Sequence, residues 1–183
     1  MTADGERARD RDEPGNRARA RDRDTAGRPR NARPRDGLGR PLPHDAAADV
    51  PRIPDDLVIS PAEAAVLGGS LLAEGRPFHA HEVFEAAWKS GPPGERDLWQ
   101  GLAQVAVGIT HARRGNTRGA VTLLRRGAAR VRGYHAGIER PYGIDPSFVV
   151  GRVEEIAAQI EQSGLTAIPA TTLLLPLSTP TRR

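Results

Sequence analysis

The sequence contains no cysteine, no long apolar run and only one lysine, and the first two absences exclude classes of protein. Without cysteine the chain can form neither a disulfide framework nor a thiolate metal site. No stretch reaches the roughly eighteen apolar residues of a membrane-spanning helix, so we expect no membrane association. Residues 1–24 are charged and lack an apolar core, which argues against a secretory signal and favours a cytoplasmic location.

The scarcity of lysine limits what the many arginines can tell us. Lys89 is the single lysine among 27 basic residues, and alanine, glycine and proline are abundant, as is typical of a GC-rich genome. Residues 1–54 hold 13 arginines against 10 acidic residues, whereas the remainder is close to neutral. An individual arginine is therefore weak support for a specific role.

Residues 1–54 alternate arginine with aspartate, glycine, proline and alanine, and almost no large apolar residue precedes Leu38. Such a segment cannot bury enough apolar surface to offset its conformational entropy. We therefore predict a disordered N-terminal tail over residues 1–54. A less favoured alternative is that residues 27–43 form an arm that docks on the domain surface or on a partner.

Helix signals dominate the rest of the chain. Ser60, Pro61 and Glu63 form a capping box with proline at the first helical position, and Asp145-Pro146 repeats the cap-plus-proline signal. Amphipathic spacing and glycine or proline stops predict five helices, at about residues 60–75, 77–89, 95–114, 117–132 and 145–162. Short connections favour antiparallel neighbours. The sequence thus predicts an all-α fold: a small bundle of about five helices over residues 55–163, followed by a strand-like or disordered C-terminal extension over residues 164–183.

The second expected helix has an unusual stripe of apolar and ionisable residues at i, i+3, i+7 and i+10 spacing: Phe78, His81, Glu85 and Trp88. Because Phe78 and Trp88 should pack against neighbours, we expect the stripe to point inward and to leave His81 and Glu85 at least partly buried. Glu82 borders this stripe. His79 falls on the opposite flank, and we expect it at the surface or in a cap.

The third expected helix carries a matching stripe at the same spacing: Gly101, Gln104, Gly108 and His111. Two glycines on one helical face cost roughly 1 kcal/mol each relative to alanine. That cost is understandable if another backbone or a ligand approaches closely. We predict that the two stripes face each other and enclose one polar pocket between the second and third helices.

Three interpretations of this pocket remain open. In the first, its polar side chains form a structural network that fixes helix register. In the second, a divalent transition metal is the cofactor, with His81, Glu85 and His111 as ligands and Glu82 as a further ligand or catalytic base. In the third, the pocket binds or transforms a small polar molecule without metal, through a histidine–carboxylate pair.

The expected ligand-binding residues are Gln104, Trp88, Gly101 and Gly108. An enzyme, with metal-dependent hydrolysis as the least unreasonable class, is compatible with these residues but has no further support. The H-E-x-x-E pattern at residues 81–85 resembles the zinc-protease H-E-x-x-H, but Glu85 stands where the second histidine would be, so we predict no protease.

Three ordered motifs resemble a known family. These are F-H-A-H-E-V-F-E-A-A-W at residues 78–88, W-Q-G-L-A-Q at 99–104 and H-A-R-R-G-N at 111–116. Together with G-A at 119–120, L-L at 123–124 and Y-G-I-D at 142–145, they are similar to the bacterial family called domain of unknown function 309. The resemblance covers about residues 71–156 and implies a small all-helical bundle without an established activity. It places the family's polar motif residues at His81, Glu82, Glu85, Trp88, Gln104 and His111.

A second class of function rests on arginines around the fourth expected helix. Arg118, Arg125 and Arg132 share one stripe, which together with the basic tail could hold a phosphate backbone. No aromatic residues are interleaved for base stacking, and a solvated face is the favoured interpretation. A nucleic-acid partner is therefore less favoured than a small-molecule or metal ligand.

Overall fold

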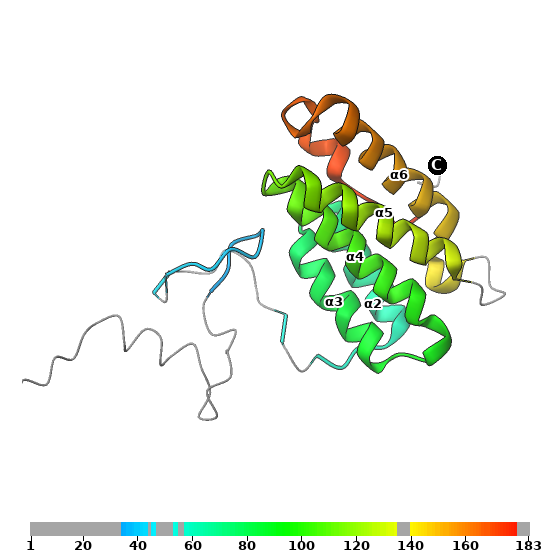
Figure 1. The fold of residues 1–183 in the computed structure, drawn as a ribbon. Helices are drawn as coiled ribbons and strands as arrows, with labels where there is room; N and C mark the ends of the chain where they lie inside the picture. Colours follow the sequence, from blue (N-terminus) through cyan, green and yellow to red (C-terminus); the bar gives the residue numbers. More distant parts are fainter. Residues whose placement is uncertain (1–33, 44, 47–52, 55–56, 135–139, 179–183) are drawn as a thin grey trace, which may run out of the picture.

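The computed structural model describes residues 34–43, 45–46, 53–54, 57–134 and 140–178. Five α-helices account for most of this part of the chain: α2 (Pro61–Ala73), α3 (Pro77–Ser90), α4 (Arg96–Arg113), α5 (Thr117–Gly133) and α6 (Pro146–Ser163) (Figure 1). Short 3-10 turns occur at Pro93–Glu95, Pro141–Gly143, Leu165–Ala167 and Ala170–Leu173. The described residues contain no β-strand beyond one isolated bridge between Arg35 and Pro41. The predicted all-α bundle is confirmed.

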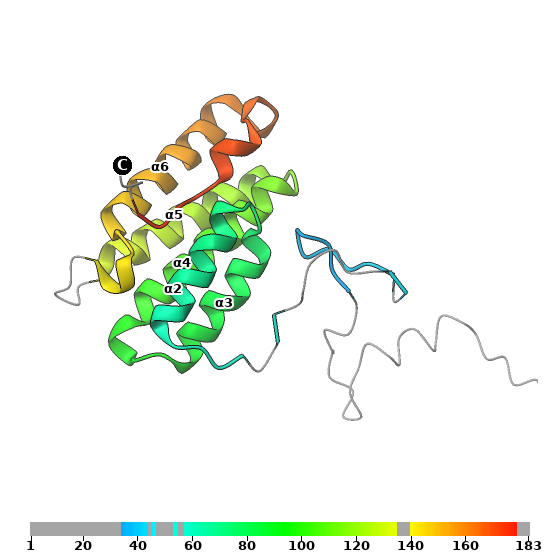
Figure 2. The same ribbon diagram turned by 180° about the vertical axis from the view of Figure 1, so that it is seen from behind.

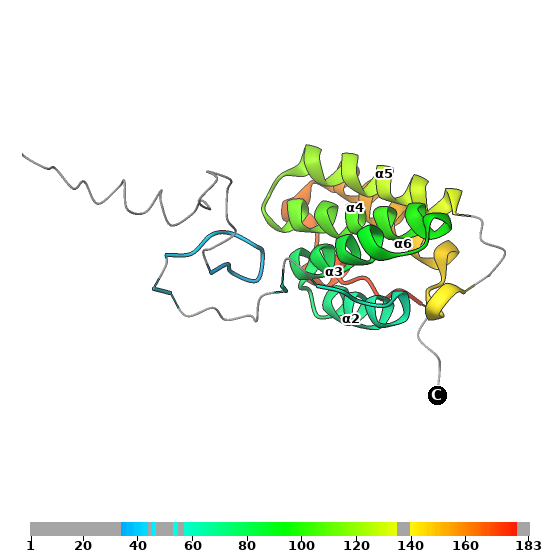
Figure 3. The same cartoon turned by 90° about the horizontal axis from the view of Figure 1, so that it is seen from below.

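Helices that follow one another in the sequence also pack against one another. The order is α2, α3, α4, α5 and α6, and α4 lies between α3 and α5 in both Figure 1 and Figure 3. Each central helix therefore has two buried flanks, one for each neighbour. This arrangement decides which of its side chains can meet which partner.

The predicted helix starts are present as hydrogen bonds. The backbone N–H of Glu63 donates to Ser60 Oγ at 3.3 Å, and the backbone N–H of Ser60 donates to Glu63 Oε2 at 3.0 Å. The side chain of Asp145 accepts from the N–H of Phe148 at 2.9 Å at the start of α6. Side-chain acceptors thus satisfy backbone donors that have no partner within the helix.

The glycine stripe of α4 faces α5 and not α3. A Cβ added to Gly101 would lie 2.7 Å from Val131 Cγ2 and 3.0 Å from the Gly127 carbonyl oxygen, and one added to Gly108 would lie 2.9 Å from Leu124 Cγ. These glycines therefore let two helix backbones approach closely. The prediction that this stripe faces the second expected helix across a shared pocket is wrong, because α5 already fills the space in front of both glycines.

A single glutamate ties the α5–α6 connection to the start of α4. The indole N–H of fully buried Trp99 donates to Glu95 Oε2 at 2.8 Å, and the hydroxyl of Tyr142 donates to Glu95 Oε1 at 2.5 Å. The bond to the carboxylate raises the pKa of Tyr142 to about 12. Tyr142 has a φ of 55°, in the left-handed region, and the Trp99 ring packs 5.9 Å from its ring.

The segment after α6 belongs to the core. Leu173, Leu175 and Leu177 are buried, and the chain crosses back over α2, where the Leu175 N–H donates to the Leu72 carbonyl at 3.5 Å. Figure 2 shows this red segment running between α6 and α2. The leucine side chains are therefore covered by the bundle. The expectation of a merely appended or disordered extension is wrong for residues 165–178.

Part of the predicted tail is also docked. Residues 1–33 lie outside the described residues, but residues 34–43 form a turn in which Asp36 Oδ1 accepts from the N–H groups of Leu38 and Arg40 at 2.9 and 2.7 Å. Leu38 is half-buried, and the buried Gly39 lies directly against the Phe78 ring. For these residues the docked arm, the less favoured alternative, is what the structure shows.

Candidate functional site

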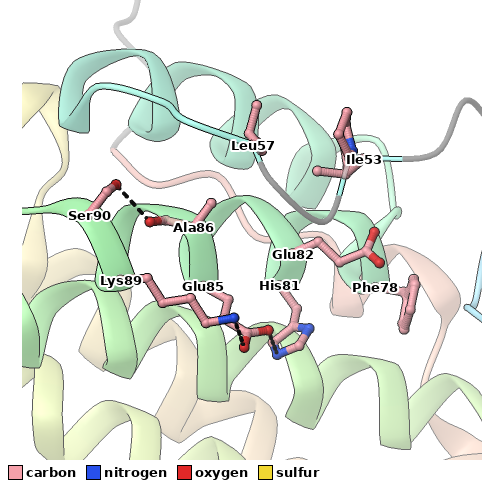
Figure 4. A pocket seen from close by; sticks show the side chains of 10 residues that line it. Ile53, Leu57, Phe78, His81, Glu82, Glu85, Ala86, Lys89 and Ser90 are labelled. Atoms are coloured by element: carbon pink, nitrogen blue, oxygen red, sulfur yellow. Dashed lines mark hydrogen bonds and ion pairs between the residues drawn. The ribbon is translucent and has the colours of Figure 1, made fainter. Parts of the chain in front are cut away.

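An ionisable row follows one flank of α3. His81 Nε2 lies 3.5 Å from Glu85 Oε2, and Lys89 Nζ lies 2.8 Å from Glu85 Oε1 (Figure 4). The side chains of His81 and Glu85 are 28% and 34% exposed, so the expectation of partial burial is confirmed. The prediction that this stripe forms the inward face of the helix is wrong, because a purely apolar row is the fully buried one: Ala80, Val83, Phe84 and Ala87.

A groove of about 400 Å³ opens beside this row, between α3 and the segment that leads into α2. Its apolar wall includes Ile53 and Leu57 from that segment and Phe78 and Ala86 from α3. Its ionisable residues are His81, Glu82, Glu85 and Lys89, all from α3 (Figure 4). None of the residues that line the groove comes from α4. The predicted pocket between α3 and α4 is thus replaced by a groove on the outer side of α3.

Burial controls the protonation state of His81. Partial removal of the ring from water lowers its pKa, Glu85 opposes this change, and the Lys89 ammonium adds to it. The imidazole is therefore neutral at neutral pH, since its ordinary pKa of about 6.5 is already below 7. A neutral ring can accept a proton or a hydrogen bond from a molecule in the groove.

His111 is held in a different place. Its Nδ1 lies 2.7 Å from Asn116 Nδ2, in the turn that joins α4 to α5, and Gly119 packs against the ring. Among the residues that the structure describes, no three histidine, aspartate or glutamate side chains group to hold a metal ion. The expected metal ligands His81, Glu85 and His111 are therefore not brought together. The physical reason is that His111 belongs to the α5-facing side of α4.

The residues expected to bind ligand lie outside the groove. Gly101 and Gly108 pack on α5, as described above, and neither Gln104 nor Trp88 lines the groove. Both of these side chains are half-buried, and Trp88 Nε1 and Gln104 Oε1 are buried with no hydrogen-bond partner among the described residues. The Arg96 guanidinium lies 5.7 Å from the centre of the Trp88 ring. Of the expected site residues, only His81, Glu82 and Glu85 line the groove.

The sequence interpretation missed two kinds of residue. Ile53 falls in the predicted disordered tail and Leu57 just before the first expected helix, although isolated apolar residues in a polar segment are themselves a sign of packing. His79 was expected at the surface but is only 3% exposed, within reach of the charge of Asp36 in the docked turn. Burial lowers the pKa of His79, the Arg76 charge lowers it further, and Asp36 opposes both.

The two α3 histidines predict an acid-sensitive fold. Because the pKa values of His79 and His81 are lowered in the folded state, the unfolded chain binds more protons below about pH 6.5. Their stabilisation is complete above that pH and is lost as the pH falls toward their folded pKa values. We expect the free energy of unfolding, measured by urea denaturation, to fall between about pH 7 and pH 5, and to fall less in His79→Gln. An unchanged pH slope in this variant would contradict the assignment.

The arginine stripe of α5 is largely paired. Arg125 Nη2 lies 2.5 Å from Glu161 Oε2, and Arg132 forms an ion pair with Glu154, so two stripe residues clamp α5 to α6. Arg118 is exposed and has no ion-pair partner within the described ranges. The stripe as a whole is therefore not a free basic face.

Comparisons with known proteins agree with the sequence motifs. Residues 66–123 match the model of the family described as Domain of unknown function (DUF309). An 85-residue region is 34% identical to the uncharacterized protein YpuF of Bacillus subtilis (strain 168), covering 46% of this chain and 48% of that protein. The chain thus spans about half the length of this curated relative. No solved structure matches.

The family match includes the histidine–glutamate motif of α3, the Q-G-L-x-Q motif of α4 and the turn that contains His111. The Y-G-I-D segment at residues 142–145 lies beyond it. No helix in the described part of the chain has the length and apolar character needed to cross a bilayer. The resemblance found in the sequence is confirmed to this extent: residues 66–123 match the DUF309 family model.

Proposed function

We propose that this protein binds a small organic ligand in the α3 groove. The observation that carries the proposal is the composition of the groove: apolar side chains, one of them aromatic, and a row of ionisable side chains line the same space of about 400 Å³. Pockets that bind small molecules usually measure about 300–1,000 Å³ and combine an apolar lining with a few polar groups. The α3 groove has both properties.

The charges in the groove favour a ligand that carries an amine. Glu82 and Glu85 contribute two carboxylates, Lys89 contributes one ammonium, and His81 is neutral. The ionisable row therefore has a formal charge of −1. An amine joined to an apolar body would place its positive end beside the carboxylates and its body against Phe78 and Leu57.

A metal ion is a poorer occupant of the same groove. A structural or catalytic metal usually needs at least three protein ligands, and among the described residues no three histidine, aspartate or glutamate side chains group to hold one. The third expected ligand, His111, is bonded within the α4–α5 turn. This leaves His81 and Glu85 as a hydrogen-bonding pair that can orient an organic ligand.

The groove is partly shaped in advance. The Arg35 guanidinium lies 5.6 Å from the centre of the Phe78 ring, and Gly39 packs against the same ring. The docked turn therefore fixes the Phe78 side chain before any ligand arrives. A side chain ordered beforehand reduces the entropy lost on binding.

Ligand-observed NMR tests the proposal with four probe sets: apolar amines, amino acids, carboxylates and phosphate esters. We expect the amines to bind the full chain and to shift amide signals within residues 78–89. In Ala86→Phe, which fills the groove from its floor, the affinity should fall at least about tenfold, the equivalent of about 1.4 kcal/mol.

The matched control is Ala129→Phe, since Ala129 is an exposed helical alanine on α5, away from the groove. This variant should bind as the wild type does. Equal affinity of an amine for both phenylalanine variants, or no binding from any probe set, would overturn the proposed function.

A further inference from the structure

One end of the bundle concentrates the positive charge of the molecule. Three segments meet there: the docked turn at residues 34–43, the α2–α3 turn at residues 74–76 and the α4–α5 turn at residues 113–118. The Arg114 side chain donates to the Leu38 carbonyl, and the Arg113 side chain donates to the Gly75 carbonyl. Figures 1 and 3 both show the docked turn beside the end of the bundle where α4 passes into α5. We call these three segments the basic pole.

The charge of the basic pole is not balanced locally. Its basic residues are Arg35, Arg40, Arg76, Arg113, Arg114 and Arg118, and its acidic residues are Asp36 and Glu74. Six arginines against two acids give a formal charge of +4, as large as the net charge of the whole 183-residue chain, +4. The rest of the molecule therefore balances to about zero. The pairing of the α5 arginines with α6 is one reason for that balance.

Two of these guanidinium groups are fixed in place by uncharged acceptors, since Arg113 and Arg114 donate to backbone carbonyls. Arg35 is positioned by a hydrogen bond of 2.7 Å to the Gly39 carbonyl. Arg40 and Arg118 are exposed, and no side-chain partner is present for them among the described residues. Pre-positioned guanidinium groups of this kind are well suited to phosphate oxygens.

We propose that the basic pole binds the phosphate backbone of double-stranded nucleic acid without reading its sequence. The three segments contain no exposed aromatic residue on which an unpaired base could stack, and Phe78 next to them is already covered by Arg35 and Gly39. The exposed large apolar residues of the described chain, Val58, Val66, Leu67 and Tyr142, all lie outside the pole. A lipid surface, which is usually met by basic and apolar side chains together, is therefore a poorer fit.

The segment that precedes the pole in the sequence also has an excess of positive charge. Residues 1–33 precede the docked turn and contain ten arginines against seven acidic residues. This segment enters the domain at Pro34, which belongs to the pole. The sequence that leads into the pole thus carries a further formal charge of +3.

Fluorescence anisotropy of a labelled DNA duplex of mixed sequence, titrated with the full chain at several salt concentrations, tests the proposal. If about four phosphates are neutralised, the logarithm of the affinity should fall with the logarithm of the salt concentration with a slope of about −4. In Arg40→Gln/Arg118→Gln the slope should become less steep by about 2, and the affinity at low salt should fall at least about tenfold.

The matched control is Arg125→Gln/Arg132→Gln, which removes the same charge from the ion-paired α5–α6 seam. It should leave the slope within about half a unit of the wild type, and thermal unfolding should show that both double variants are folded. An equal loss of affinity in the two double variants would overturn the proposal. So would the absence of binding to the duplex at low salt, or binding to phosphatidylserine vesicles that the Arg40/Arg118 substitutions abolish while duplex binding stays unchanged.

Discussion

Replacing Leu175 with alanine is expected to lower the free energy of unfolding by about 2–5 kcal/mol, although the residue lies after the last helix. The Leu175 side chain is fully buried, and its backbone N–H donates to α2 at Leu72. Its truncation therefore removes apolar contacts and leaves a cavity between α2 and α6. Urea denaturation followed by circular dichroism measures this change.

The neighbouring leucine provides the control for this experiment. Leu174 is only half-buried and points to the turn at Gly75, so Leu174→Ala should cost clearly less, about 1 kcal/mol or below. Equal losses in the two variants would mean that Leu175 is not buried against α2. The closing segment would then be an appendage, as the sequence first suggests, and the core would end with α6.

Adding one methyl group at Gly127 is expected to destabilise the bundle by about 1–3 kcal/mol. A Cβ there would lie 2.8 Å from the Gly101 carbonyl oxygen and 2.9 Å from the Val105 backbone nitrogen. Because these neighbours are backbone atoms, no side-chain rotation relieves the contact, and α4 and α5 would have to separate. The loss must also exceed the gain of roughly 1 kcal/mol that alanine brings to a helix interior.

Gly151 provides the opposite case within the same chain. It is an exposed glycine inside α6, and an added Cβ would meet no atom within 4 Å. Gly151→Ala should therefore raise the free energy of unfolding by about 0.5–1 kcal/mol. Two substitutions of the same chemical size should thus change stability in opposite directions. If both variants are stabilised, the close approach of α4 and α5 is incorrect.

The helices were predictable because their signals are local. The Ser60 capping box, the Asp145 cap and the glycine stops each involve residues within a few positions of one another. The apolar row Leu98, Leu102, Val105 and Ile109 is completely buried, as its spacing predicts. Local chemistry of this kind does not depend on which helices become neighbours.

The position of the site was harder to predict because helical periodicity identifies a shared face but not its partner. α4 has two neighbours, and its Gly101 stripe could have faced either of them. The backbone of α5 takes that position, which separates His111 from His81 and Glu85. The glycines themselves held the signal: small residues on both α4 and α5, at positions 101, 108 and 127, indicate a close helix–helix approach.

Long-range docking explains the other differences. Leu38 and the leucines at positions 173–177 lie in segments without periodicity, so nothing local predicts the surface they cover. The ion pairs Arg125–Glu161 and Arg132–Glu154 were predictable from the sequence. The two arginines are seven residues apart on α5, and the two glutamates are seven residues apart on the antiparallel α6, so each pair lies on one helical face.

The measurement that tests the central claim most directly is a crystal structure of the protein soaked with the tightest-binding amine from the probe sets. The α3 groove predicts ligand density between Leu57 and α3, with the amine nitrogen within hydrogen-bond distance of Glu82 or Glu85 and the ligand body against Phe78. Density between α3 and α4, or a ligand that touches no groove residue, would contradict the account.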